Sequence, residues 1–417
     1  MAISRSEDGP APLATRARPT EHLPTWKATW RSDLLAVAGY AAATVAFFWR
    51  VVALGMVPVG YDLVTYFYPY KAYVGQLVRE GELPLWNPMI FMGAPLLANV
   101  QAAVLYPADA LFLLLPAVDA LRYSVVLHVF LAALFTYLFA RLSLGLSPMG
   151  AWLAGAVFAL GGYMGAHVGH LNQLHAAAWL PALTLCLERA VSLRSSGMAL
   201  LGGAVLAVQF LAGHTQQVYY SLWALGMLAL YLAAFGGHST RERLRPFVAL
   251  GAMVAVGGSV AGIQLLPTLE LMQESYRSGG IPLQEAVAYS VRPRELLDAV
   301  LPLYSQAPYV ETTGYVGVVS LALLPAAVAW RSRPPWQWFF SAMAALALLL
   351  SLGDSTPVYG WLHRGVPGFD LFRAPGRWLF LYSFSLAVLV GIGADSLSVG
   401  WREDDLRRWL GRYGLAL

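Results

Sequence analysis

Long unbroken apolar stretches dominate this sequence and restrict its fold more than any other feature. Hydrophobic residues fill 58% of the 417 positions and charged residues only 12%, whereas soluble domains are about 45–50% apolar and about a quarter charged. Roughly 20 consecutive apolar residues are needed for a helix to cross a bilayer, and a membrane β-barrel would show short alternating segments instead. These figures exclude a disordered chain, a fibrous repeat and an ordinary soluble enzyme. We predict a polytopic membrane protein of the all-α class.

The apolar stretches predict a transmembrane domain of about ten helical spans over residues 33–395. Residues 1–32 are polar and lack a signal-peptide cleavage pattern, so we expect a disordered cytoplasmic tail there. Residues 396–417 are expected to form a cytoplasmic C-terminal segment. The predicted spans are 33–54, 121–140, 148–166, 174–190, 197–213, 217–236, 246–266, 314–330, 336–352 and 377–395.

The placement of basic residues predicts how this bundle is oriented in the cell membrane. An even number of spans puts both termini on one side, where the tails and short loops carry 17 of the 27 Lys and Arg residues. Short basic loops face the cytoplasm, so both termini are expected there. The net charge of +4 therefore reflects topology and does not indicate a nucleic-acid partner. The single cysteine, Cys186, permits no intramolecular disulfide.

Three long loops are expected on the outer face, at 57–120, 267–313 and 353–376. Long loops are uncommon unless they are functional, and these are rich in aromatic residues, Pro and single charges, unlike Gly/Ser linkers. In the first loop, prolines at positions 84, 88 and 95 exclude one continuous helix. We expect short interfacial helices and turns.

Asp62 is the acidic residue that stands out in the first outer loop. It lies in an aromatic stretch, 61–73, and such rings settle at the level of the lipid headgroups. A carboxylate there could accept a proton from a hydroxyl acceptor while a lipid-linked donor lies in the bilayer. The alternative is that Asp62 caps the helix that follows it. The sequence leaves both interpretations open.

Several separated motifs, in order, resemble the bacterial YfhO-type membrane proteins. They are Asp62, Gly81-Glu82-Leu83-Pro84-Leu85-Trp86-Asn87-Pro88, Gly93-Ala94-Pro95, Gln101 with Tyr106-Pro107, Gly169-His170-Leu171-Asn172-Gln173, Gly213-His214-Thr215-Gln216-Gln217 and Phe372-Arg373-Ala374-Pro375-Gly376-Arg377. YfhO-type proteins are in turn similar to the GT-C superfamily of membrane glycosyltransferases. The resemblance covers roughly residues 35–395.

The resemblance implies a GT-C-like fold, with an acid near the end of the first span and a polyprenyl-phosphate sugar as donor. By position, Asp62 matches that acid. Proteins of this type are often longer, with more spans or an outer domain beyond this point. An incomplete C-terminus is therefore an open alternative, and acceptor recognition is the part of the function that it would affect.

Polar residues at the expected outer ends of the spans are candidates for lining a sugar-binding cavity. Hydroxyl and amide hydrogen bonds would bind the sugar, and ionisable groups near a span are functional candidates. Helix capping and ordinary interface polarity are the alternative. We predict that the substrate contacts Tyr66, Tyr70, His170, Gln173, His214, Gln217 and Glu270. No ligand spacing supports a metal site or a divalent cation, and no cofactor is indicated.

Arg373 and Arg377 lie just before the last span, on the expected outer face. They depart from the inside-positive trend. A spacing of four places them on one helical face if the helix has begun at Arg373, but Pro375 indicates instead that the turn starts there. Two guanidinium groups at the lipid boundary suit the binding of a phosphate. Anchoring to phospholipid headgroups is the alternative.

Together these residues favour a hexosyltransferase-type enzyme at the outer face of the cytoplasmic membrane. A sugar would pass from a polyprenyl-phosphate donor to an envelope lipid or polymer, with Asp62 as base and the two arginines binding the phosphate. The alternatives are a transporter or flippase of a lipid-linked substrate and a non-enzymatic envelope-assembly protein. Phosphate-binding and dinucleotide-binding loops are not found in the sequence.

Overall fold

The computed structural model describes residues 30–236, 239–301, 310–329 and 335–398 and is a bundle of α-helices. Within those ranges the sole sheet is a two-stranded antiparallel hairpin, β1 (Trp86–Asn87) and β2 (Ala94–Pro95). The all-α class is thus confirmed. The predicted tail up to residue 29 and the segment after residue 398 lie outside the described residues, as do positions 302–309 of the second outer loop.

The helices follow one another along the chain with short breaks. They are α1 (Trp30–Phe47), α2 (Trp49–Ala53), α3 (Tyr68–Arg79), α4 (Leu111–Leu114), α5 (Ala117–Leu142), α6 (Pro148–Leu160), α7 (Gly162–Ala166), α8 (Leu171–Ala177), α9 (Leu180–Ser192), α10 (Ser196–Leu211), α11 (Thr215–Phe235), α12 (Thr240–Val260), α13 (Gly262–Gln273), α14 (Leu283–Ala286), α15 (Val318–Ala329), α16 (Trp336–Ser351), α17 (Pro357–Gly365) and α18 (Leu379–Ser398).

Five helical stretches in the described part of the chain are long and apolar enough to cross a membrane. They are Ala117–Leu142, Pro148–Gly169, Thr215–Phe235, Thr240–Val260 and Pro375–Leu397. Three shorter apolar helices accompany them, at Ser196–Leu211, Val318–Ala327 and Trp336–Ser351. The chain is accordingly a multi-pass membrane protein. Helix occupies each of the ten predicted spans, but four of them are interrupted. The breaks lie between α1 and α2, α6 and α7, α8 and α9, and α12 and α13.

The last span is the core of the bundle. Helix α18 packs against α6, α15 and α16, and 83% of the apolar window in Pro375–Leu397 is buried, compared with 22% in α12. Burial of apolar side chains between helices gives α18 a fixed position, while α12 exposes much of its surface at the periphery. The turn that precedes α18 therefore projects from the most firmly held element of the fold.

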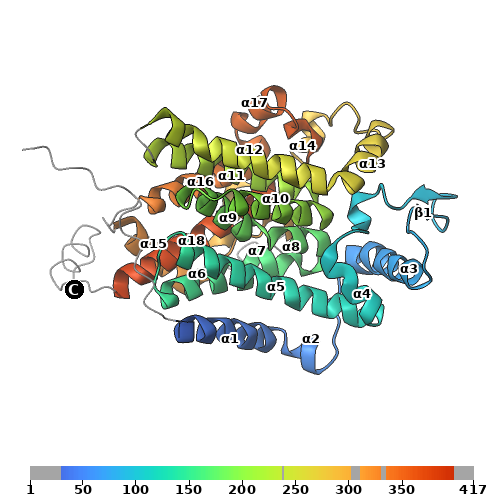
Figure 1. Cartoon of the computed structure of the whole chain (residues 1–417), viewed down its shortest axis with the longest axis horizontal. Coiled ribbons are helices and arrows are strands. Elements are labelled where there is room, and N and C mark those ends of the chain that lie inside the picture. Colours follow the sequence, from blue (N-terminus) through green and yellow to red (C-terminus); the bar gives the residue numbers. More distant parts are fainter. Residues whose placement is uncertain (1–29, 237–238, 302–309, 330–334, 399–417) are drawn as a thin grey trace, which may run out of the picture.

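The two ends of the bundle differ in architecture. Figure 1 shows the beginning of α1 and the end of α18 at one end of the bundle, while α3, α13 and the β1 hairpin gather at the other. Which side of the membrane each end faces stays a prediction. The loop-rich end corresponds to the predicted outer loops, and we call it the outer end.

The first outer loop is a folded layer, as its prolines predicted. It contains a π-helical turn (Leu63–Phe67), α3, the β1 hairpin, two short 3-10 turns and α4. Lys71 of α3 is buried, and its ammonium group donates to the Asp109 carboxylate and, at 3.2 Å, to the Ala102 carbonyl oxygen. This buried ion pair ties α3 to the segment that precedes α4. The hairpin was not anticipated from the sequence.

Candidate active site

Asp62 lies at the outer end of the bundle beside His170. Its side chain makes no capping hydrogen bond to the turn that follows, so the capping interpretation is wrong. One carboxylate oxygen, Oδ2, is instead 3.2 Å from Nε2 of His170. About half of the Asp62 side chain is exposed (51%), which leaves the carboxylate accessible to a substrate.

A close backbone approach brings these two residues together. Gly60 packs on Gly169, and a Cβ atom at Gly60 would lie only 3.2 Å from the Cα atom of Gly169. Gly60 lies two residues before Asp62, and Gly169 directly precedes His170. The absence of a side chain at Gly60 therefore allows the start of the first outer loop to reach the turn between α7 and α8.

The surroundings of His170 favour the neutral form of its imidazole. Burial lowers its pKa, and the neighbouring His167 lowers it further, whereas Glu311 and Asp62 act in the opposite direction. A neutral imidazole that faces a carboxylate through Nε2 is stabilised when Nε2 carries the proton. His170 is then the donor and Asp62 the acceptor, so that His170 orients the carboxylate without neutralising its charge.

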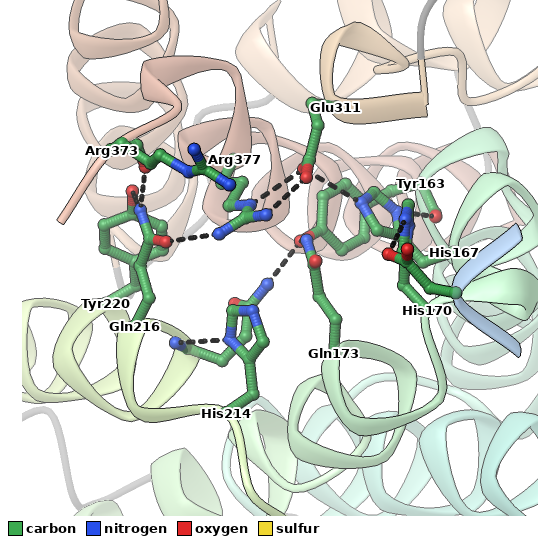
Figure 2. Close-up of polar contacts among 12 residues, drawn as sticks. Tyr163, His167, His170, Gln173, His214, Gln216, Tyr220, Glu311, Arg373 and Arg377 are labelled. Atoms are coloured by element: carbon green, nitrogen blue, oxygen red, sulfur yellow. Dashed lines mark hydrogen bonds and ion pairs between the residues drawn. The ribbon is translucent and has the colours of Figure 1, made fainter. Parts of the chain in front are cut away.

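Glu311 is the centre of a second group of contacts (Figure 2). Its Oε2 accepts from Nε of Arg377 at 2.9 Å, and its Oε1 accepts from Nη2 of Arg377 at 2.5 Å. Nε2 of His167 lies 3.5 Å from Oε2. The Glu311 side chain is only 5% exposed. Burial alone would raise the pKa of Glu311, but its contacts with His167 and Arg377 hold that pKa well below its usual range.

The backbone around Arg377 is shaped for this contact. Pro375 begins a 3-10 turn (Pro375–Trp378) that leads into α18, and Gly376 packs directly on the segment that carries Glu311. A Cβ atom at Gly376 would lie 2.4 Å from the Glu311 carbonyl oxygen. The turn can therefore approach the second outer loop closely enough for the bidentate ion pair to form.

Gln216, at the start of α11, connects the two arginines. Its Oε1 accepts from Nη1 of Arg377 at 2.6 Å, and its Nε2 donates to the carbonyl oxygen of Arg373 at 2.6 Å. The Arg373 side chain is exposed, and its guanidinium has no hydrogen bond or ion pair within the described residues. Ala374, which lies between Arg373 and the turn, has a left-handed backbone (φ 65°). The helix therefore has not begun at Arg373, the turn starts at Pro375, and the two arginines do not share a helical face.

Tyr163 joins the amide groups of two predicted substrate residues. Gln173 donates to its hydroxyl at 3.0 Å, and Gln217 donates to the same oxygen. The Tyr163 ring stacks on His167, with ring centroids 4.2 Å apart. Both glutamines are buried, so their amides hold Tyr163 and the packing of α7 and are not open to a substrate in this structure. Their predicted role is corrected accordingly.

The remaining predicted site residues have other positions. Nδ1 of His214 accepts from the backbone N–H of Gln217 at 3.2 Å and caps α11, so the capping alternative holds for this residue. Tyr66 and Tyr70 stack on each other with centroids 4.4 Å apart, and Asn99 donates to the Tyr66 hydroxyl at 2.8 Å. Glu270 is exposed on α13, with no side-chain contact to the groups above among the described residues.

Arg377 is likewise not a free phosphate-binding group. Each of its three guanidinium nitrogens already has an acceptor in Glu311 or Gln216. The sequence did not single out Glu311, because it is one of many acids in the outer loops. His167 was visible as part of a polar turn, and its spacing of four from Tyr163 places both on one face of a helix.

Metal binding finds no support in this arrangement. In the part of the chain that the structure describes, no three His, Cys, Asp or Glu side chains are grouped so that they could hold a metal ion. The chemistry available among the predicted site residues is that of an exposed carboxylate beside an imidazole, at Asp62 and His170, and of an exposed guanidinium at Arg373.

No protein-family model matches the chain and no curated protein matches it, so the resemblance to YfhO-type proteins stays a prediction. One solved structure whose backbone is similar to that of this chain is ArnT from Cupriavidus metallidurans bound to undecaprenyl phosphate. The TM-score is 0.49 and the identity 14%, over 93% of this chain and 63% of that one. This chain thus spans less than two thirds of that protein, and a similarity of this size assigns no role to any residue.

Proposed function

We propose that this protein is a membrane glycosyltransferase that uses a polyprenyl-phosphate-linked sugar as donor. The observation that carries the proposal is the state of Asp62: an exposed carboxylate, released from helix capping and oriented by His170. A carboxylate held in this way at the outer end of a transmembrane bundle suits proton removal from a hydroxyl. The sequence motifs and the donor class expected of GT-C proteins supply the choice of reaction.

In the proposed reaction, the acceptor hydroxyl attacks the anomeric carbon of the donor sugar. A bond forms between the acceptor oxygen and that carbon, and the bond from the carbon to the phosphate oxygen breaks. The hydroxyl proton passes to Asp62, and the bonding electrons leave with the polyprenyl phosphate. Since the leaving group is a phosphate that is stable as an anion, the step requires no general acid. Fixed cations that face the developing charge supply much of such a rate.

Arg373 is the residue that we assign to the donor phosphate. Its guanidinium is exposed and unpaired among the described residues, and Arg is suited to bidentate phosphate binding. Arg377 takes a different role from the one first predicted: it holds Glu311 and Gln216 and so fixes the turn that carries Arg373. Tyr66 and Tyr70 remain proposed sugar contacts, because their stacked rings follow Asp62 in the same outer-loop segment.

Substitution of Asp62 by Asn tests the proposal, because it removes the basic oxygen and keeps the size of the side chain. General-base contributions are typically 10²–10⁴-fold, so Asp62→Asn should lower transfer from a polyprenyl-phosphate sugar by about that factor while expression and the thermal midpoint in detergent stay normal. Asp354→Asn is the matched control and should retain activity, because Asp354 is an exposed outer-loop carboxylate that makes no hydrogen bond or ion pair with Asp62 or His170 in the described part of the chain. Full activity of Asp62→Asn would refute the role of this residue and make Glu270 the next carboxylate to test.

A further inference from the structure

We propose that Gln216 is a positioning residue that holds Arg373 in the orientation needed to bind the donor phosphate. The inference rests on the proposed function, because it concerns the cation assigned to that phosphate. Gln216 belongs to α11 and Arg373 to the segment before α18, 157 positions apart along the chain. Two independent observations carry it: the hydrogen bonds of the Gln216 amide and the backbone conformation next to Arg373.

The amide of Gln216 uses both of its donors and its acceptor. Its Nε2 donates to the Arg373 carbonyl oxygen at 2.6 Å and to the Tyr220 hydroxyl at 2.7 Å, while its Oε1 accepts from Arg377 at 2.6 Å. A carboxylate of the same shape would lack the two donors, and an ammonium group would lack the acceptor. Among side chains of this length, only Gln can make all three contacts.

The backbone beside Arg373 is held in an unfavourable conformation. Ala374 has φ 65° and ψ 75°, in the left-handed region, where a Cβ atom is disfavoured. Ala374 is fully buried. Such a conformation persists only when the surroundings over-determine it, and here hydrogen bonds hold both sides: Gln216 binds the carbonyl of Arg373, and the backbone N–H of Arg377 binds the carbonyl of Ala374 at 3.0 Å.

Because of this turn, the side chain of Arg373 is exposed while that of Arg377 is held in contacts with Glu311 and Gln216. Arg373 precedes the left-handed residue and has an exposed side chain, whereas Arg377 follows it and is paired with Glu311. Figure 2 shows Gln216 between the backbone of Arg373 and the guanidinium of Arg377. Gln216 therefore fixes the backbone of Arg373 relative to Arg377, whose guanidinium is held by Glu311. This preorganises the Arg373 side chain for phosphate binding.

The kinetic test uses Gln216→Glu, which keeps the size of the side chain and an acceptor for Arg377. It replaces the donor to the Arg373 carbonyl by a second acceptor oxygen. The KM for the polyprenyl-phosphate sugar should rise about tenfold, the effect of losing one favourable hydrogen bond to a fixed partner, while the KM for the acceptor stays unchanged. Tyr220→Phe removes the other partner of Nε2 and leaves the Arg373 contact, so it is the matched control with an unchanged donor KM.

A double-mutant cycle separates positioning from a general structural effect. Arg373→Ala keeps the backbone carbonyl but removes the guanidinium, so Gln216→Glu should have no further effect on donor KM in that background. If Gln216→Glu and Arg373→Ala each raised the donor KM, and the double variant raised it by the product of the two factors, the proposal would be overturned. An equal rise in donor KM in Tyr220→Phe would also overturn it.

A spectroscopic test decides the positioning without any reaction. The only cysteine, Cys186, is buried, so Cys186→Ala gives a background for a nitroxide label at Arg373→Cys. The label should have the same mobility in this background and in Tyr220→Phe, and be distinctly more mobile in Gln216→Glu. Identical line shapes in all three would overturn the positioning role. If the wild-type chain transferred no sugar, the proposed function would fail, while these line shapes would still show whether Gln216 fixes the backbone at Arg373.

Discussion

Replacement of Glu311 by Gln is expected to lower the free energy of unfolding by about 3–5 kcal/mol, the usual effect of removing one partner from a buried ion pair. The Glu311 side chain is 5% exposed and that of Arg377 is 19% exposed, so water can compensate little of the lost interaction. Gln keeps the shape but loses the negative charge and one of the two acceptor oxygens. The guanidinium of Arg377 is then left without its counter-ion.

The assay is unfolding of the purified protein by titration with SDS in mixed micelles, followed by tryptophan fluorescence. Glu285→Gln is the matched control, because Glu285 lies 3.8 Å from Arg277 with both side chains about one third exposed. Exposed pairs of this kind contribute only about 0–1 kcal/mol. If Glu311→Gln destabilised the protein no more than Glu285→Gln does, the reasoning about a buried clamp at the outer end would be refuted.

Two further predictions concern the same site. The pKa of Glu311 is lowered in the folded state, so its contribution to stability is present above its unfolded pKa of about 4.3 and is lost as the pH falls below it. The difference in unfolding midpoint between wild type and Glu311→Gln should thus be constant near neutral pH and shrink in acid; a constant difference down to pH 3 would contradict it. Gly60→Ala would force Gly169 away from Asp62 and should lower transfer about tenfold, with overpacking of about 1–3 kcal/mol. Gly258→Ala, which has open space around it in α12, is the control: it should leave transfer activity unchanged and raise stability by about 0.5–1 kcal/mol, as alanine does in place of glycine within a helix. Equal effects of the two glycine substitutions would show that the close approach at Gly60 is not needed.

Much of the fold could be predicted because long apolar stretches have few solutions in a bilayer. All ten predicted spans contain helix, and the first outer loop has the short helices and turns that its prolines required. Breaks within the spans were harder to anticipate. Helix α12, for example, ends at Val260 and α13 begins at Gly262 inside one continuous apolar run. Composition does not reveal such a break, because the residues directly on either side of it are mostly small or apolar.

The site was only partly predictable for a different reason. Asp62 and His170 were recognised separately, but their contact depends on Gly60 packing against Gly169, which no local pattern encodes. Glu311 was one acid among many until the fold placed it against Arg377. His214 shows the opposite error, because a polar residue at the start of α11 serves as its cap. Pairings between distant segments were the missing information.

The most direct test of the proposed transferase is to follow the fate of the donor with the purified protein in lipid nanodiscs. Polyprenyl-phosphate sugars labelled in the sugar are supplied together with envelope lipid and polymer extracts, and both free polyprenyl phosphate and labelled acceptor are measured. The account predicts equal amounts of the two products for wild type and a loss of both by a factor of about 10²–10⁴ for Asp62→Asn. A donor that remains intact with every sugar and extract, even if it crosses the bilayer when the protein is placed in sealed vesicles, would contradict the account and favour a transporter.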